Sequence, residues 1–256
     1  MAAIVLISLT LTILVVGYSF INYNGGNLVS PSPEKAIDDF LLVSNSTMMQ
    51  SGKVVVLFVG AEACPFCAAE SWSIVDALKH YGSFIGLSHI SSNSSEKIAN
   101  VPGYGFANAS FVSTTLSFWE VETTTSSWDQ KLQSLNSTEQ ALFQKYDPNN
   151  SIPFLLIGGM YLLIGSSVSP EPVSELSWSQ CFNMTSNTTS FGNQVKNEAK
   201  NMTDVIEYLE TRNSLTNSSS QYPNTNGILQ LSNNTMKSHS RYVYDIEHTV
   251  SVTWSD

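Results

Sequence analysis

The feature of this chain that most constrains its fold is a continuous apolar run, Val54–Val59, which two cysteines follow closely. A run rich in β-branched residues predicts a strand buried on both faces, as in a parallel or mixed sheet. The segment Gly60–Ala63 then leads to Cys64, and Pro65 suits the first position of a helix because no backbone N–H is needed there. We therefore expect a strand, a loop and a helix that opens with the pattern Cys-x-x-Cys.

This arrangement is typical of thiol–disulfide redox centres. Disulfides exchange when a thiolate attacks sulfur, and the unpaired N–H groups and dipole at a helix start stabilise a thiolate there. On this interpretation Cys64 attacks the substrate, and Cys67 resolves the mixed disulfide by closing a Cys64–Cys67 bond. The intervening Pro65 and Phe66 would tune the reduction potential of that bond.

Two other interpretations of the cysteine pair stay open. The pair could form a permanent structural disulfide, or it could supply half of a zinc site. The sequence has no second Cys-x-x-Cys, and its four histidines are scattered, so we expect neither a metal nor a cofactor. The third cysteine, Cys181, is left over and could be a buried thiol or could pair with another chain.

Pro153 is the second candidate site residue. It follows Ile152 and precedes an apolar run that continues, after Gly158-Gly159, into a second apolar run. In redox folds of this kind a cis proline at this point faces the cysteines, and its missing N–H keeps the loop open for a substrate backbone. The alternative is an ordinary proline at the first position of a strand.

Composition limits the partners of the chain. The net charge is −10, charged residues make up 12%, and no cluster of Lys and Arg is present. Nucleic acid is therefore not an expected partner, because phosphate binding needs a basic patch. Asn-x-Ser/Thr sequons recur along the chain and favour an exported, glycosylated protein. The sequon asparagines are Asn45, Asn93, Asn108, Asn136, Asn149, Asn183, Asn187, Asn201, Asn217 and Asn233.

The order of segments suggests four regions. Residues 2–21 are uncharged and mostly apolar, long enough to anchor the chain in a membrane, although a cleaved signal peptide is the alternative. Residues 22–33 have the composition of a linker, residues 34–211 form the folded domain, and residues 212–256 form a flexible Asn/Ser-rich tail. We expect a single-pass cell-membrane protein with the bulk of the chain outside.

Periodicity and capping signals predict further elements of the domain. They are a helix after Ser32, a strand over Phe84–Ile90, a helix capped by Ser137, a hairpin around Gly158-Gly159, a helical stretch from Val173 to about Cys181 and an amphipathic helix over Gln194–Leu209.

Four short segments carry a resemblance to a known family. They are Cys64–Trp72 (CPFCAAESW), Glu139–Leu142 (EQAL), Ile152–Phe154 (IPF) and Leu176–Gln180 (LSWSQ). The chain resembles the thioredoxin-like superfamily over about residues 54–164. More closely, it resembles an archaeal, membrane-anchored thioredoxin-like family of undetermined function over about residues 33–209.

The resemblance implies an α/β fold of the thioredoxin type, in which helices flank a mixed sheet in three layers, together with an N-terminal transmembrane helix. It also implies that Cys64 is the nucleophile, Cys67 the resolving thiol and Pro153 a cis proline. It implies no particular substrate.

One residue departs from the thioredoxin pattern. Many thioredoxins place a buried acid in the strand beneath the cysteines, and Phe58 holds that position here. Proton transfer would then fall to water, to Glu62 or to Glu70, although each glutamate could be an ordinary surface residue. The missing acid favours an oxidant or an isomerase over a general reductase.

Two functions follow from these observations. The first is a thiol–disulfide oxidoreductase or isomerase that acts on the thiols and disulfides of exported proteins through Cys64 and Cys67. The second is a glycosylated extracellular binding or structural protein that uses the same fold with a structural disulfide.

Overall fold

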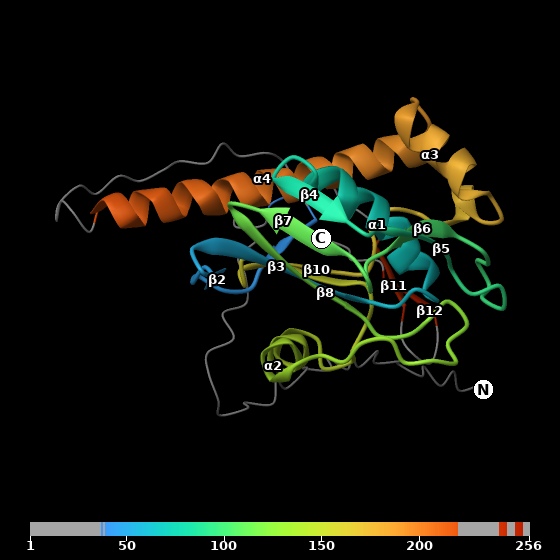
Figure 1. Ribbon diagram of the computed structural model, residues 1–256, viewed down its shortest axis with the longest axis horizontal. Helices are drawn as coiled ribbons and strands as arrows, with labels where there is room; N and C mark the ends of the chain where they lie inside the picture. Colours follow the sequence, from blue (N-terminus) through green and yellow to red (C-terminus); the bar gives the residue numbers. More distant parts are fainter. Residues whose placement is uncertain (1–36, 38, 220–240, 245–248, 253–256) are drawn as a thin grey trace, which may run out of the picture.

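A mixed β-sheet forms the centre of the protein (Figure 1). The computed structural model describes residues 37, 39–219, 241–244 and 249–252. The sheet strands are β1 (Leu41–Leu42), β2 (Met49–Gln50), β3 (Lys53–Gly60), β8 (Leu116–Glu122), β9 (Phe154–Ile157) and β10 (Tyr161–Ile164). The strand β3 pairs in parallel with β8 along one edge and antiparallel with β9 along the other. The apolar run that opened the sequence is therefore the central strand, and its residues from Val54 onward are buried.

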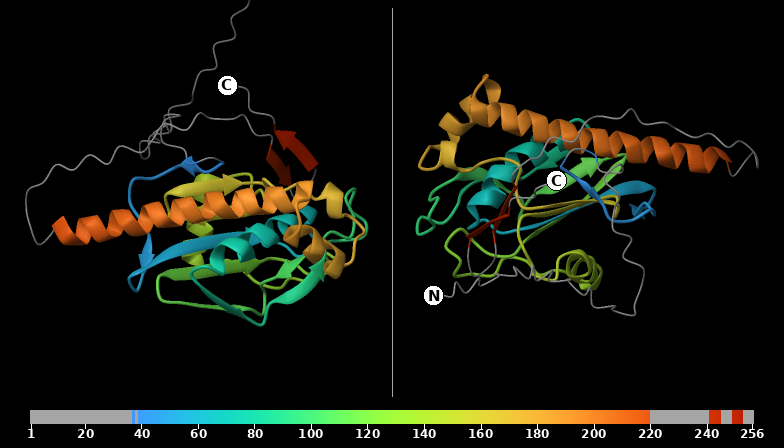
Figure 2. Two further views of the ribbon diagram at one scale, coloured as in Figure 1. Left: turned by 90° about the horizontal axis from the view of Figure 1, so that it is seen from above. Right: turned by 180° about the vertical axis from the view of Figure 1, so that it is seen from behind.

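Helices cover both faces of this sheet. They are α1 (Pro65–Leu78), α2 (Ser137–Tyr146), α3 (Trp178–Ser186) and α4 (Ser190–Ser219), with a 3₁₀ turn η2 (Glu171–Val173). The helices α1 and α4 lie on one face and α2 lies on the other (Figure 1). Seen from above, the long α4 runs across the sheet beside α1 (Figure 2). The described residues thus form a mixed α/β fold with a mixed sheet between helices.

Three two-stranded antiparallel sheets complete the described fold. They are β4 (Gly82–Ile85) with β7 (Ser110–Ser113), β5 (Ser88–Ser91) with β6 (Pro102–Gly105), and β11 (Arg241–Tyr244) with β12 (Thr249–Val252). The single strand expected over Phe84–Ile90 is wrong. Gly86, with φ of +81°, interrupts it, and its two halves pair with different partners. Positive φ is a conformation that glycine adopts readily, so the chain changes direction there.

Most of the buried apolar side chains form one core between the sheet and the helices. Leu57 and Phe58 of β3 belong to it, together with Ile74 of α1 and Ile206 of α4. Burial of each such side chain contributes about 1.5–3 kcal/mol relative to exposure. A second cluster joins α3 and the start of α4 to the other side of α1. The helix that carries the cysteines is therefore held on two sides.

Three expected elements differ in the structure. Ile37 and Phe40 form an isolated antiparallel bridge and Leu41 pairs with Leu162, so the helix expected after Ser32 is wrong in its described part. Pairing with the sheet edge outweighs the helical spacing of the apolar residues in this short segment. Asn136, one residue before the expected Ser137, caps α2. The helix expected from Val173 begins later, as α3.

The hairpin prediction is confirmed. The three-residue connection between β9 and β10 contains a β-turn in which Met160 N–H donates to Ile157 O at 3.1 Å. Its two central residues, Gly158 and Gly159, have the positive φ that this turn requires, +59° and +65°. The amphipathic helix over Gln194–Leu209 is also confirmed, although α4 extends to Ser219, into the segment expected to be a flexible tail.

Residues 2–21 lie outside the described residues. Among the helices that are described, none is long and apolar enough to cross a membrane.

Candidate functional site

The two cysteines lie at the start of α1. Cys64 is the N-cap residue, Pro65 occupies the first turn, and the backbone N–H of Cys67 donates a hydrogen bond to Cys64 Sγ at 3.2 Å. A side-chain acceptor at this position satisfies a backbone N–H that has no partner within the helix. The sequence pattern thus places Cys64 Sγ where a negative charge on sulfur is stabilised by a backbone dipole.

Both sulfur atoms are buried and free. Cys64 is 0% exposed and Cys67 is 3% exposed. Burial raises the pKa of the Cys67 thiol well above its usual value, and the hydrogen bond and charge of Cys64 raise it further. Cys67 therefore holds its proton in the reduced protein, and any reaction that uses it as a nucleophile must first remove that proton.

Pro153 lies at the same end of the central strand. The Ile152–Pro153 peptide bond is cis, and both residues are buried. Phe154 pairs with Val59 of β3 in the antiparallel register, so Pro153 lies next to the position where β3 ends and the cysteine loop begins. Pro153, which is far from the two cysteines in the sequence, therefore lies at the same end of the sheet as Cys64 and Cys67.

A pair of carboxyl groups, of which Glu122 is buried and Glu62 half-buried, lies on the other side of the same strand end. Glu122 is the last residue of β8 and is 3% exposed, and its side chain shares a hydrogen bond with that of Glu62 in the loop before Cys64. Burial and the negative charge of Glu62 raise the pKa of Glu122 to about 8. Burial also raises the pKa of Glu62, while the shared hydrogen bond lowers it. The shared proton therefore resides on Glu122, which donates to Glu62.

The parallel register brings this pair to Cys67. Gly60 is the residue of β3 opposite Glu122, and a Cβ atom added at Gly60 would lie 3.4 Å from Cys67 Sγ. The absence of a side chain at Gly60 leaves room for the Phe58 ring and lets this strand end approach Cys67. In agreement, the charge of an ionised Glu122 raises the pKa of Cys67.

Glu122 is the site residue that the sequence did not reveal. The expectation that no buried acid lies beside the cysteines is wrong, because β8 supplies the acid that the Phe58 position lacks. Phe58 instead packs edge-on against Phe106, with ring centroids 5.5 Å apart. An acid at the end of a strand that pairs in parallel with the cysteine strand is the signal that could have found Glu122.

Glu62 and Glu70, the two acids that the sequence did suggest, have different surroundings. Glu62 is half-buried and belongs to the carboxyl pair. Glu70 is 0% exposed, so it is not a surface residue, and it accepts a hydrogen bond from Ser166 Oγ at 2.7 Å. Burial raises the pKa of Glu70 to about 7. Glu70 thus binds α1 to the loop that follows β10.

Cys181 lies apart from the other cysteines, in the second apolar cluster with Trp72 of α1. It is fully buried and free, and burial raises its pKa to about 12.

Across the part of the chain that the structure describes, no three His, Cys, Asp or Glu side chains are grouped as metal ligands.

Comparison with known proteins assigns a family. The family model described as Domain of unknown function (DUF929) matches residues 39–208, which include both cysteines, Pro153 and the carboxyl pair. Searches of curated proteins and of solved structures find no match. The chain therefore belongs to the DUF929 family.

Proposed function

We propose that this chain is a thiol–disulfide oxidoreductase or isomerase of thioredoxin-like fold, with Cys64 and Cys67 as its redox centre. The observation that carries the proposal is the Cys-x-x-Cys at the start of α1, where Cys67 N–H donates to Cys64 Sγ beside the Glu62–Glu122 carboxyl pair. A structural disulfide needs neither this hydrogen bond nor a buried acid.

The reaction begins when the Cys64 thiolate attacks one sulfur of a substrate disulfide. A Cys64–substrate disulfide forms and the other substrate sulfur leaves as a thiolate. Cys67 then loses its proton and attacks Cys64 Sγ, which releases the second substrate thiolate and closes the Cys64–Cys67 bond. Two electrons pass from the dithiol to the substrate, and the reverse sequence oxidises a substrate dithiol.

The carboxyl pair serves the second step. Two proton transfers occur together: Cys67 gives its proton to Glu122, and Glu122 gives the proton it shared to Glu62. Afterwards Glu62 is protonated, and Glu122 holds the proton that came from the Cys67 sulfur. Glu62 is half-buried and can pass its proton to solvent, whereas Glu122 is buried. With this acid present, the site is as compatible with a general reductase as with an oxidant or isomerase.

The location also remains a proposal. We propose that residues 2–21 anchor the chain in the cell membrane and that the folded domain lies outside, where its substrates are the thiols and disulfides of other exported proteins. The uncharged apolar N-terminal segment and the many sequons support this location.

The test is reduction of insulin disulfides and refolding of a scrambled disulfide protein by the reduced and oxidised chain. Wild-type protein is expected to accelerate at least one of the two reactions, and Cys64→Ser is expected to abolish that acceleration. The Cys181→Ser variant is the matched control and should keep the activity, since Cys181 lies in a different cluster. Equal rates for wild type and Cys64→Ser would overturn the proposal.

A second candidate function is supported by burial. Both sulfur atoms are almost completely covered, as expected for cysteines that form a permanent bond in a binding or structural protein. In that case the oxidised chain would be inactive in both assays, and its disulfide would resist reduction by glutathione.

A further inference from the structure

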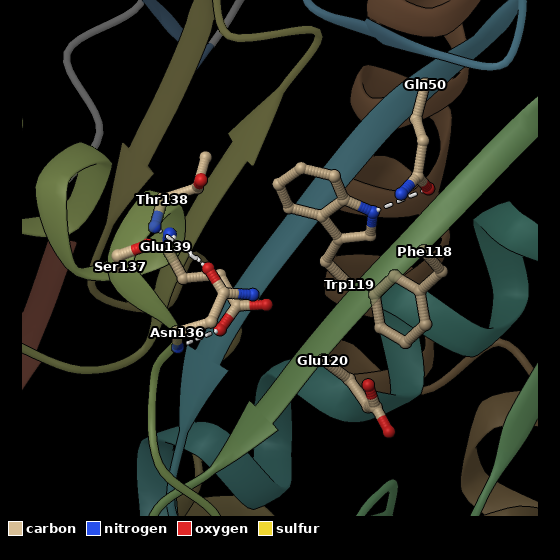
Figure 3. A pocket seen from close by; sticks show the side chains of 8 residues that line it. All are labelled: Gln50, Phe118, Trp119, Glu120, Asn136, Ser137, Thr138 and Glu139. Carbon is tan, nitrogen blue, oxygen red and sulfur yellow. Dashed lines mark hydrogen bonds between the residues drawn. The ribbon is translucent and has the colours of Figure 1, made fainter.

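An open groove of about 470 Å³ lies between β8 and the first turn of α2, on the face of the sheet opposite α1 (Figure 3). It is separate from the cysteine site, whose helix lies on the other face. Its lining residues are Gln50, Phe118, Trp119, Glu120 and the α2 segment Asn136–Glu139.

The walls of the groove carry the side-chain types that bind sugars. The indole N–H of Trp119 donates to Gln50 Oε1 at 3.0 Å and to Ser117 Oγ at 3.2 Å, which fixes the ring at the groove. A fixed aromatic ring offers an apolar face to the C–H side of a sugar, while carboxylate and amide groups such as Glu120 and Gln50 bind its hydroxyls.

Asn136 stands at the rim of this groove in a fixed orientation. As the N-cap of α2, its Oδ1 accepts hydrogen bonds from the backbone N–H groups of Thr138 at 2.9 Å and Glu139 at 3.0 Å. Because Oδ1 faces the helix, Nδ2 points away from it, across the groove (Figure 3). Asn136 is exposed and begins the sequon Asn136-Ser137-Thr138.

Three of the other sequon asparagines are placed differently. The Nδ2 atoms of Asn93, Asn187 and Asn201 donate hydrogen bonds to acceptors within the fold. Asn136 is exposed, and its cap bonds hold its amide in one orientation. It also lies in the same groove as the aromatic ring of Trp119. Substitution on Nδ2 leaves Oδ1 free to keep both cap bonds.

We propose that Asn136 carries an N-linked glycan whose first sugars lie in this groove against Trp119. In the transfer, a bond forms between Nδ2 and the anomeric carbon of a lipid-diphosphate-linked glycan, and Nδ2 loses one proton. The bond from that carbon to the diphosphate oxygen breaks, and the lipid diphosphate leaves. The inference is independent of the redox chemistry and requires only that the chain is exported.

The first experiment tests the attachment site. The full chain is exported from a host that N-glycosylates its own exported proteins, and its peptides are mapped by mass spectrometry. Wild type and Ser137→Ala, which keeps the sequon, are expected to carry a glycan at Asn136. Asn136→Asp and Thr138→Ala keep a side-chain cap on α2 and are expected to lose the glycan. An unmodified Asn136 in the exported wild-type chain overturns the proposal, whatever the other sequons carry.

The second experiment tests the groove. Trp119→Ala leaves the sequon intact, so its Asn136 is expected to be glycosylated. Release of that glycan by an endoglycosidase from the folded protein is expected to be about threefold to tenfold faster than in wild type, because the stacking contact is lost. Release rates after unfolding serve as the control and should be equal. Equal release from the two folded proteins overturns the placement of the glycan in the groove.

Discussion

Glu62 and Glu122 share one hydrogen bond beside Cys67, although they lie on a loop and on a strand that are distant in the sequence. The pairing follows from the parallel register of β3 and β8, which sets Gly60 opposite Glu122. Because the last residue of β3 has no side chain, the end of β3 can approach Cys67 Sγ, and the charge of an ionised Glu122 raises the pKa of that thiol. In the proposed redox mechanism, this carboxyl pair is the proton acceptor for Cys67.

Replacement of Glu122 by Gln is expected to slow the step in which Cys67 attacks the mixed disulfide. The amide keeps the size of the acid but cannot take the thiol proton, and loss of a positioned base costs about a hundredfold or more in rate. The measurement is stopped-flow release of substrate thiol from a Cys64 mixed disulfide.

The matched control is Glu120→Gln on the same strand, since Glu120 is half-buried and its side chain bonds Gln133. A Glu122→Gln rate equal to that of the control would remove Glu122 from the proton path.

The stability of the reduced protein is expected to fall as the pH rises from about 5 to about 8. The folded-state pKa of Glu122 is raised from 4.5 to about 8, so over this interval the folded state binds more protons than the unfolded state. The free energy of unfolding, measured by urea denaturation, should decrease through this window and should change less in Glu122→Gln. An identical pH slope in the two proteins would contradict the buried acid.

Glu70 is expected to affect stability without affecting the redox pair. Glu70→Ala removes the carboxyl group that bonds the Ser166 hydroxyl and the Ser167 backbone. Ser166 Oγ keeps Val168 O as an acceptor, so the Ser167 backbone group loses its partner, which costs about 1–3 kcal/mol of unfolding free energy. Glu70→Gln keeps an acceptor and should cost less. Both variants should keep the wild-type reduction potential, and a shifted potential in Glu70→Gln would place Glu70 in the redox site.

The C-terminal hairpin is expected to limit access to Cys64. Cys64 is fully buried, and β11 lies against α1, the helix that Cys64 caps. A chain that ends at Ser219 should therefore react faster with iodoacetamide at Cys64 under native conditions. Alkylation of Cys181, which is buried in another cluster, serves as the internal control. Equal Cys64 rates in the full and shortened chains would show that the core alone covers the sulfur.

Local patterns were sufficient for the parts of the fold that depend on neighbouring residues. The apolar run before Cys64, the proline after it and the two glycines between β9 and β10 each specify a backbone conformation directly. The cis bond at Pro153 agrees with the resemblance to thioredoxin-like proteins. The redox roles of these residues stay predictions.

Long-range pairing could not be predicted in the same way. The proximity of Glu122 to Cys67 could not be predicted from the sequence, because it depends on the register between β3 and β8. Leu41 has the spacing of a helical residue, yet its pairing with Leu162 at the sheet edge determines its conformation. In both cases a contact between residues far apart in the sequence outweighs the local preference.

The reduction potential of the Cys64–Cys67 pair tests the central claim most directly. The full chain is equilibrated in dithiothreitol and glutathione redox buffers, and the fraction of oxidised pair is measured by thiol trapping and mass spectrometry. An exchanging redox centre is expected to have a potential above about −300 mV, within reach of cellular thiols. A potential below about −300 mV would identify a structural disulfide and would contradict the proposed oxidoreductase.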